Sequence, residues 1–271
     1  MPKKLGVVMS GGGARGAYQI GVMEVLENAG LLENVCAYSG SSVGSLNAVL
    51  LATSTIENAK DVWLSMDEDT LFNNDKNFFK RIFEAGRDLV FEGYYQTDKL
   101  DNLIDQVINY DAIKQKNIFV TTSHVGSEDP SFFELVSFNI RNAFSKEDHV
   151  RYTNLKDLDE PTMKKTLLAS CALPIVFKPV IIDHATYYDG GVLDNTPIKP
   201  LIDYGCDEIL LIDLFRFRLK RLVHDKDVTI HTIKPSKSLR GIMDFSRKHI
   251  LRRYDLGKKD AYAFLETLSK N

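Results

Sequence analysis

A serine with one glycine two residues before it and another two residues after it stands at position 42. Residues 40–44 read Gly-Ser-Ser-Val-Gly, the pattern of a nucleophile elbow, in which a sharp turn between a strand and a helix exposes a serine hydroxyl. The small residues Gly40 and Gly44 relieve the crowding of such a turn. A serine hydroxyl attacks an ester carbonyl once a neighbouring base takes its proton. The spacing therefore indicates acyl transfer through Ser42.

A second glycine turn lies earlier in the chain, at residues 11–16. Its Gly-x-Gly-x-x-Gly spacing fits the dinucleotide fingerprint, but the segment after the next apolar run has no carboxylate for a ribose. A Walker A loop is excluded, because Ala17 and Tyr18 occupy the positions of its Lys and Ser or Thr. Backbone N–H groups of such a turn can still bind a phosphate or a transient oxyanion at a helix N-terminus.

Two kinds of residue are candidates for the base. Asp189 follows an apolar segment and precedes Gly190 and Gly191, which permit a tight turn around its carboxylate. The same Asp-Gly pair is also an ordinary turn dipeptide. The six histidines carry no local signature, yet His231 or His249 could complete a Ser-His-Asp triad in the chain order of α/β-hydrolases. Taken alone, the residues leave both bases open.

The elements that must position these groups are visible in the apolar pattern at the start of the chain. It predicts a strand over 5–9, a helix over 14–28 that Gly30 ends, a strand over 35–38 and a further helix from residue 43. A βαβ unit of this kind is right-handed and parallel, so it places both glycine turns at the carboxyl edge of one sheet.

The remaining segments predict a continuation of the same α/β domain. We expect helices through most of 58–108, strands at 118–121 and 132–138, a helix over 162–171, a hairpin of 180–182 with 186–188, a strand at 208–213, and helices over 238–253 and 258–268. Several aromatic residues could line an acyl-chain groove, although their helical spacing is more typical of a core: Trp63, Phe78, Phe79, Phe83, Phe91, Tyr94 and Tyr95.

Composition places the chain among globular proteins. Its 271 residues are 44% hydrophobic and 26% charged, which excludes disordered, collagen-like and disulfide-built classes. No apolar run approaches the ~18 residues of a transmembrane helix, and the N-terminus lacks the apolar core of a signal peptide. Three widely spaced cysteines form no C-x-x-C pair, so we expect a cytoplasmic protein without a disulfide framework, metal site or cofactor.

The net charge of −3 conceals an asymmetry. Residues 214–259 hold 14 Lys or Arg against 4 Asp. This basic segment is either a solvated face or a surface that attracts anionic membrane lipids. Nucleic acid is not expected as a partner, because no nucleic-acid-binding motif accompanies the charge.

Several segments together resemble the patatin-like phospholipase family. The segments that carry the resemblance are 11–16 (Gly-Gly-Gly-Ala-Arg-Gly), 40–44, 168–179, 189–191 (Asp-Gly-Gly) and 191–197. They occur in the family's order, and the likeness covers about residues 5–213. It implies a three-layer α/β/α sandwich with a mainly parallel central sheet, formed by a single domain over 1–271 with a basic helical segment from 214 onward.

The resemblance also implies a function and a site. It implies a serine lipid acyl hydrolase of the phospholipase A or lysophospholipase type, independent of calcium, with Ser42 as nucleophile and Asp189 as proton acceptor. The oxyanion hole would be formed by the backbone of Gly11, Gly12 and Gly13. Supporting positions would be Arg15, Gly16, Gly40, Gly44, Gly190, Gly191 and Asn195.

Some of these positions carry more specific expectations. Arg15 braces the glycine turn or docks a lipid phosphate, and Asn195 fixes the loop behind Asp189. Val43 departs from the family, whose members commonly carry alanine there, and this narrows the pocket. Two other functions stay open beside the triad: a nucleotide-binding module, and a lipid-binding protein without hydrolytic activity. The sequence specifies no oligomeric state.

Overall fold

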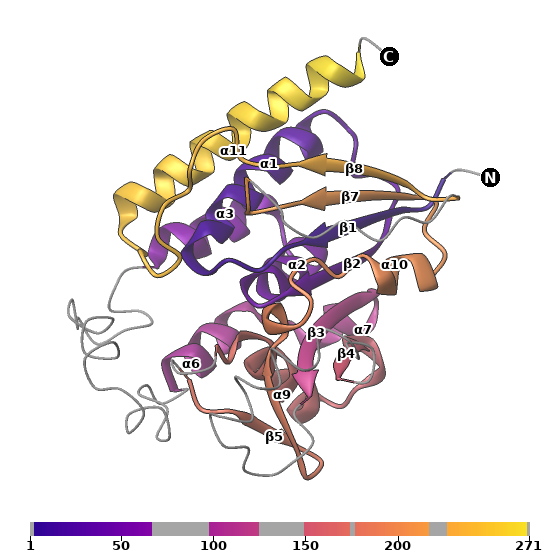
Figure 1. Ribbon diagram of the computed structural model, residues 1–271, viewed down its shortest axis with the longest axis vertical. Helices are drawn as coiled ribbons and strands as arrows, with labels where there is room; N and C mark the ends of the chain where they lie inside the picture. The colour runs from indigo at the N-terminus through magenta and orange to yellow at the C-terminus, as the bar shows by residue number, and fades with distance from the viewer. Residues whose placement is uncertain (1–2, 67–97, 125–148, 174–176, 217–226, 270–271) are drawn as a thin grey trace.

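The computed structural model describes residues 3–66, 98–124, 149–173, 177–216 and 227–269. The strand expected at 132–138 and the aromatic residues between 78 and 95 lie outside them. The described residues form an eight-stranded sheet with helices on both sides (Figure 1). Its strands are β1 (Leu5–Met9), β2 (Val35–Ser41), β3 (Ile118–His124), β4 (Val150–Asn154), β5 (Val180–Ile182), β6 (Ala185–Asp189), β7 (Glu208–Ile212) and β8 (Thr229–Ile233).

Five of the strands form a parallel core in the order β3-β2-β1-β7-β8. At one end of this core, β4 and β6 both pair antiparallel with β3, and β5 pairs antiparallel with β6. The predicted fold class, an α/β sandwich with a mainly parallel sheet, is confirmed. The predicted βαβ start is also confirmed, since β1 and β2 are parallel neighbours.

Helices cover the two faces of the sheet unequally. Alternate residues of β1 serve different cores: Val7 and Met9 face the large one, and Val8 faces a smaller one beside Leu201. The helices are α1 (Ala17–Asn28, after the 3-10 turn Gly13–Gly16), α2 (Val43–Thr53), α3 (Ile56–Ser65), α6 (Asp98–Val107), α7 (Tyr110–Lys114), α9 (Glu160–Cys171), α10 (Lys199–Asp203) and α11 (Arg247–Leu268). None of the described helices combines the length and the apolar character needed to cross a bilayer.

The C-terminal region differs from the prediction of two helices over 238–253 and 258–268. A single 22-residue helix, α11, runs from Arg247 to Leu268, and the segment 238–246 is not helical. Gly257 does not interrupt α11, because it lies where α11 crosses α1 and a Cβ there would overlap the carbonyl oxygen of Tyr18. Figure 1 shows α11 lying along α1. The glycine serves close helix packing and is not a helix end.

Two strands were not predicted. Both β4 and β8 contain polar residues at positions where a buried strand would be apolar, as in Arg151 and His231. Both strands lie at margins of the sheet. Strands at a margin are less enclosed by the core, so they can carry polar side chains. With β8, the sheet extends past residue 213, the expected end of the core.

Candidate active site

Ser42 occupies a strained turn between β2 and α2. Its φ of 54° and ψ of −133° lie in a region that non-glycine residues rarely adopt. The flanking glycines make this turn possible: a Cβ on Gly40 would overlap the carbonyl of Gly44, and one on Gly44 would overlap that of Met9. The N–H of Ser42 donates to Oγ of Ser170 at 3.1 Å. The predicted nucleophile elbow is thus present in the backbone.

The sheet brings Asp189 next to this elbow. Strand β2 pairs with β3 as far as Ser41 opposite Thr121, and β6 begins its pairing with Asp189 opposite Thr122. Because β4 takes the other edge of β3, both strands lie end to end along one edge. The last residue of β6 therefore lies directly beyond the last residue of β2, beside Ser42.

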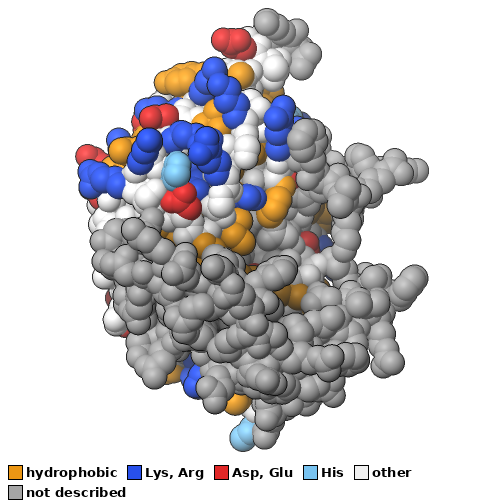
Figure 2. Space-filling model, turned by 60° about the vertical axis from the view of Figure 1, so that its left-hand side comes forward, with side chains coloured by type: hydrophobic (Ala, Val, Ile, Leu, Met, Phe, Trp, Pro, Cys, Tyr) orange, Lys and Arg blue, Asp and Glu red, His pale blue; other side chains and the backbone are white. Residues whose placement is uncertain are grey.

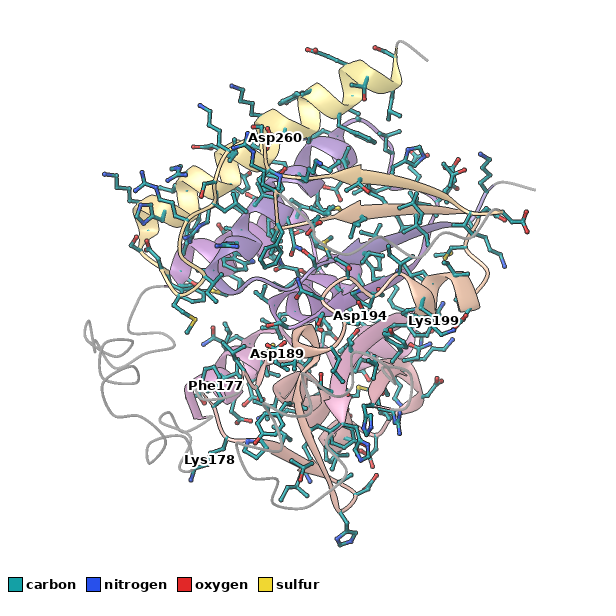
Figure 3. All side chains as sticks on the ribbon, in the orientation of Figure 1. Phe177, Lys178, Asp189, Asp194, Lys199 and Asp260 are labelled. Carbon is teal, nitrogen blue, oxygen red and sulfur yellow. The ribbon has the colours of Figure 1, made fainter. Side chains whose placement is uncertain are left out.

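Figure 3 labels Asp189 near the centre of the view. Its side chain is almost fully buried, with 2% of its surface exposed. Its carboxylate accepts a hydrogen bond from the N–H of Gly191 at 2.7 Å, and the neighbouring Ser42 hydroxyl favours its charged form. The backbone N–H of Asp189 donates to the carbonyl of Ala172 at 3.0 Å, and its carbonyl accepts from the Ser123 hydroxyl at 2.9 Å. Burial raises the pKa of Asp189 to about 7, against the opposing effect of Gly191 and Ser42. The group can therefore take up and release a proton near neutral pH.

The glycine turn is held from below by Asn195. The N–H of Gly11 donates to the carbonyl of Asn195 at 3.2 Å, and Nδ2 of Asn195 donates back to the carbonyl of Gly11 at 3.1 Å. In the part of the chain that the structure describes, the N–H groups of Gly12 and Gly13 donate to no protein acceptor. Of the three predicted glycines, two thus have free amides and Gly11 does not.

Behind the turn lies a buried chain of amide side chains that sequence reasoning missed. Trp63 Nε1 donates to Asn47 Oδ1 at 2.8 Å, and Asn47 Nδ2 donates to Gln19 Oε1 at 2.7 Å. Gln19 Nε2 then donates to the carbonyl of Ser10 at 2.9 Å. The signal was present in the sequence, because Gln19 and Asn47 are amides on otherwise apolar helix faces. Such a position indicates a satisfied polar network.

Arg15 braces the turn from outside. Its Nε donates to the carbonyl of Arg240 at 2.7 Å, and its guanidinium lies 5.3 Å from the ring centre of Phe215. The adjacent Ala14 donates its N–H to the carbonyl of Ile242 at 2.7 Å. These contacts match the bracing role among the two expected for Arg15.

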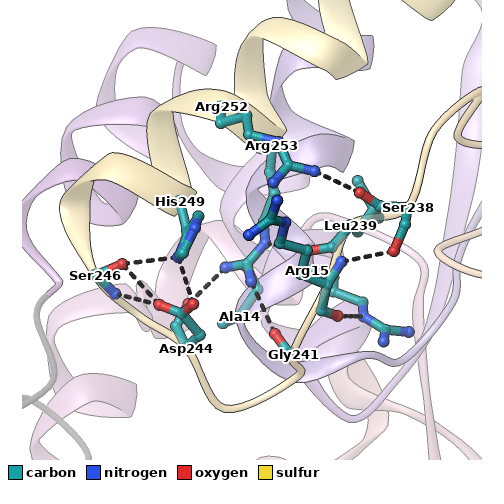
Figure 4. A network of polar contacts seen from close by, with 11 residues as sticks. Ala14, Arg15, Ser238, Leu239, Gly241, Asp244, Ser246, His249, Arg252 and Arg253 are labelled. Atoms are coloured by element: carbon teal, nitrogen blue, oxygen red, sulfur yellow. Dashed lines mark hydrogen bonds and ion pairs between the residues drawn. The ribbon is translucent and has the colours of Figure 1, made fainter.

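The segment 238–246 owes its shape to Arg253, which is 1% exposed. Its guanidinium donates to the carbonyls of Leu239, Gly241 and Asp244 at 2.9, 2.8 and 2.6 Å. It also reaches the carbonyl of Ala14 in the glycine turn at 3.0 Å (Figure 4 shows this region). Burial lowers the pKa of Arg253 to about 10, so the side chain remains charged. One buried cation thus ties α11 to the glycine turn.

Ser42 and Asp189 lie at an apolar cavity of about 360 Å³. Its mouth includes Phe215 and Ile242, and Gly12 and Gly13 line it beside Ser42. The apolar lining is contributed by helices, by the segment 238–246 and by single residues between them: Val43, Leu46, Leu50, Trp63, Met66, Leu100, Leu103, Val107, Leu173, Phe177, Met243 and Phe245. Of the aromatic residues predicted for a groove, Trp63 is here and the others lie outside the described residues.

No histidine in the described ranges lines this cavity. His231 lies on β8 with its ring 6.2 Å from that of Phe264, and His249 on α11 contacts Asp244 and Ser246. His224 lies outside the described residues. Among the described side chains, no cluster of three His, Cys, Asp or Glu could hold a metal ion. The geometry pairs the serine with a carboxylate.

These features define an α/β protein with a serine–aspartate pair at the carboxyl edge of its sheet. The sequence profile of patatin-like phospholipases matches residues 7–202. A probable lipid hydrolase, 463L of Invertebrate iridescent virus 6, is 24% identical over 73% of this chain and 63% of its own. Lysophospholipase NTE1 of Cryptococcus neoformans is 23% identical over 78% of this chain and 11% of its own length. The chain therefore spans less than two thirds of either relative.

Solved structures agree on the fold. VipD from Legionella pneumophila superposes with a TM-score of 0.56 at 14% identity, covering 98% of this chain and 67% of VipD. ExoU from Pseudomonas aeruginosa, solved with SpcU, gives 0.53 at 17% identity, covering 98% of this chain and 52% of ExoU. With the profile matching most of its length, this chain belongs to the patatin-like phospholipase family.

Proposed function

We propose that this protein is a serine acyl hydrolase of lipids, of the phospholipase A or lysophospholipase type. One observation carries the proposal: Ser42 and the buried carboxylate of Asp189 lie side by side in the lining of an apolar cavity. In this proposal Ser42 is the nucleophile and Asp189 the proton acceptor. The names of the two relatives, a lipid hydrolase and a lysophospholipase, support the same class of substrate.

The reaction has two halves. As Asp189 takes the hydroxyl proton, Oγ of Ser42 attacks the ester carbonyl, and the resulting tetrahedral oxyanion collapses to an acyl-enzyme. The leaving alcohol or lysolipid departs with the proton from Asp189. Asp189 then takes a proton from water, the hydroxide releases the fatty acid, and the proton returns to Ser42. A pKa of about 7 suits Asp189 to both directions of transfer near neutral pH.

We assign the oxyanion hole to the N–H groups of Gly12 and Gly13. This narrows the expectation of three glycines, because the Gly11 amide is already engaged with Asn195. Each donor of this kind typically lowers the barrier by ~3 kcal/mol. Gly11 and Asn195 position the turn, and the amide chain from Trp63 holds it from behind.

The apolar walls favour a fatty acyl chain as the part of the substrate that enters the cavity. The mouth, with Phe215 and Ile242 partly exposed, leaves the alcohol side of the ester toward solvent. A nucleotide would need polar partners for its base and phosphates, and the described lining offers few. The cavity thus supports lipid hydrolysis over nucleotide binding.

The proposal is tested with a fluorophosphonate probe, which reacts covalently with activated serines. Mass spectrometry of the labelled peptide should locate the adduct on Ser42, and Ser42→Ala should abolish labelling and ester hydrolysis. Ser41→Ala is the matched control: Ser41 adjoins Ser42, is buried, and its hydroxyl has no partner among the described residues. It should label and turn over like the wild type. An adduct on Ser41, Ser10 or Ser45, or full activity in Ser42→Ala, contradicts the assignment.

A further inference from the structure

The segment that closes the cavity is strongly basic. Residues 234–253 contain seven Lys or Arg and one acidic residue, Asp244. Asp244 is already engaged by Ser246 and His249, and its pKa lies below its ordinary value as a result of these contacts and nearby charge. The next acid along α11 is Asp255, two turns beyond the helix start. Within this described segment, little negative charge offsets the cations.

The cations lie beside exposed apolar side chains. Phe215 and Ile242 line the cavity and are 39% and 36% exposed. Arg240 comes two residues before Ile242, and Arg247 and Lys248 begin α11; all three are exposed. Figure 2 shows Lys and Arg side chains gathered on one part of this face with hydrophobic side chains next to them. We use the name basic rim for the three cations together with the two apolar residues beside them: Phe215, Arg240, Ile242, Arg247 and Lys248.

We propose that the basic rim is a docking surface for an anionic lipid bilayer, which presents substrate to the cavity mouth. Lys and Arg at a membrane surface are attracted to anionic headgroups, and apolar side chains between them enter the headgroup layer. This orientation points the cavity at the bilayer, so an acyl chain can pass from lipid to protein without crossing water. The proposal rests on lipid hydrolysis as the function of the cavity, but docking is measured without hydrolysis.

The apolar side chains favour a bilayer over other polyanions. A nucleic acid also attracts Lys and Arg, but its phosphate backbone offers nothing to an exposed Ile242 that borders an apolar cavity. An anionic bilayer matches both the charge and the apolar residues. Nucleic acid is accordingly an outcome of the test and not a second proposal.

The test is co-sedimentation with vesicles, using Ser42→Ala throughout so that lipid is not consumed. Phosphatidylcholine vesicles are compared with vesicles that also contain phosphatidylglycerol. Binding to the anionic vesicles should be stronger and should weaken as salt rises. Adding Arg247→Glu and Lys248→Glu should lower the anionic partition coefficient by about tenfold or more, since each cation near such a surface contributes several-fold.

The matched control adds Lys4→Glu and Lys116→Glu, which reverse two exposed charges just before β1 and β3. These positions lie at the amino edge of the sheet, opposite Ser42, so binding should change less than about twofold. Equal binding to neutral and anionic vesicles would overturn the proposal, and so would an equal loss of binding in the control variant. The proposal would also fail if the rim substitutions abolished binding to RNA but left binding to vesicles unchanged.

Activity separates this proposal from the proposed function. With Ser42 intact, the rim variant should hydrolyse a soluble short-chain ester like the wild type and hydrolyse vesicle lipid more slowly. If the wild type hydrolyses neither ester, the hydrolase proposal fails while vesicle binding still decides the rim. If the rim variant loses activity on the soluble ester and on vesicle lipid equally, the rim does not act by docking the protein to the bilayer.

Discussion

The carboxyl group of Asp189 is held in two opposing ways. Burial favours its neutral form, whereas the Ser42 hydroxyl and the Gly191 N–H favour the charged form, and burial prevails. The spacing around Ser42 and Asp189 identified both as candidates. It did not choose between aspartate and histidine as base, because that choice depends on β6 joining β3 beyond the end of β2. Asp189 pairs with Thr122, 67 positions earlier in the chain, and a pairing over that distance leaves no local pattern.

The raised pKa predicts how activity depends on pH. Because the carboxylate is the reactive form and its pKa is about 7, kcat/KM should rise about tenfold per pH unit below 7 and level off above it. Asp189→Asn should lower turnover by several orders of magnitude. Single His→Ala variants, measured over the same pH range, should keep the ascending limb. If His231→Ala or His249→Ala instead removes the limb in a folded protein, a triad replaces the pair.

The same variant has a stability signature that serves as its folding control. The folded-state pKa of Asp189 lies above its ordinary value of 3.8, so ionisation disfavours the folded protein increasingly as pH rises from about 4 to about 7. Asp189→Asn should therefore melt at a higher temperature than the wild type at pH 8, with the difference narrowing toward pH 4.

Helices and strands were predicted correctly from the sequence where the hydrophobic periodicity and the turn residues indicate the same element. The strand at 5–9, the hairpin around residue 184 and the helix ending at Cys171 are as expected. The segment 238–246 is different, because its helical spacing was real but its backbone carbonyls bond to Arg253. A long-range partner overrode local propensity there, and only the fold reveals it.

Arg253 should accordingly matter more to stability than its neighbour Arg252. Arg253→Met leaves four carbonyls without their donor, two of them buried, and should cost roughly 2–5 kcal/mol, because each buried acceptor left unsatisfied costs about 1–3 kcal/mol. Arg252→Met is the control: among the described residues its side chain loses one hydrogen bond, to the carbonyl of Ser238, and the change should cost about 1 kcal/mol. Urea unfolding midpoints measure both. Equal costs would mean that Arg253 does not organise the segment.

The whole molecule divides differently in sequence and in space. The family profile ends at residue 202, and the chain before it holds Ser42, Asp189 and the glycine turn. The later residues add β7, β8 and α11 to the same sheet and core, and they supply one wall of the cavity. Net charge follows the sequence division: Lys and Arg outnumber Asp and Glu after residue 202, and the reverse holds before it. The substrate pocket is therefore shared between the two parts.

The contacts of Ala14 have a consequence for the order of events during synthesis. Its N–H bonds to Ile242 and its carbonyl to Arg253, 239 positions further along the chain. During translation, Ser42 and the glycine turn therefore leave the ribosome long before Ile242 and Arg253, which hold the glycine turn in place. Nascent chains arrested after residue 233 on a long unstructured linker should not react with a fluorophosphonate probe, whereas chains arrested after residue 271 on the same linker should. Under the proposed function, the serine would thus become reactive only after the residues that complete the cavity wall have left the ribosome.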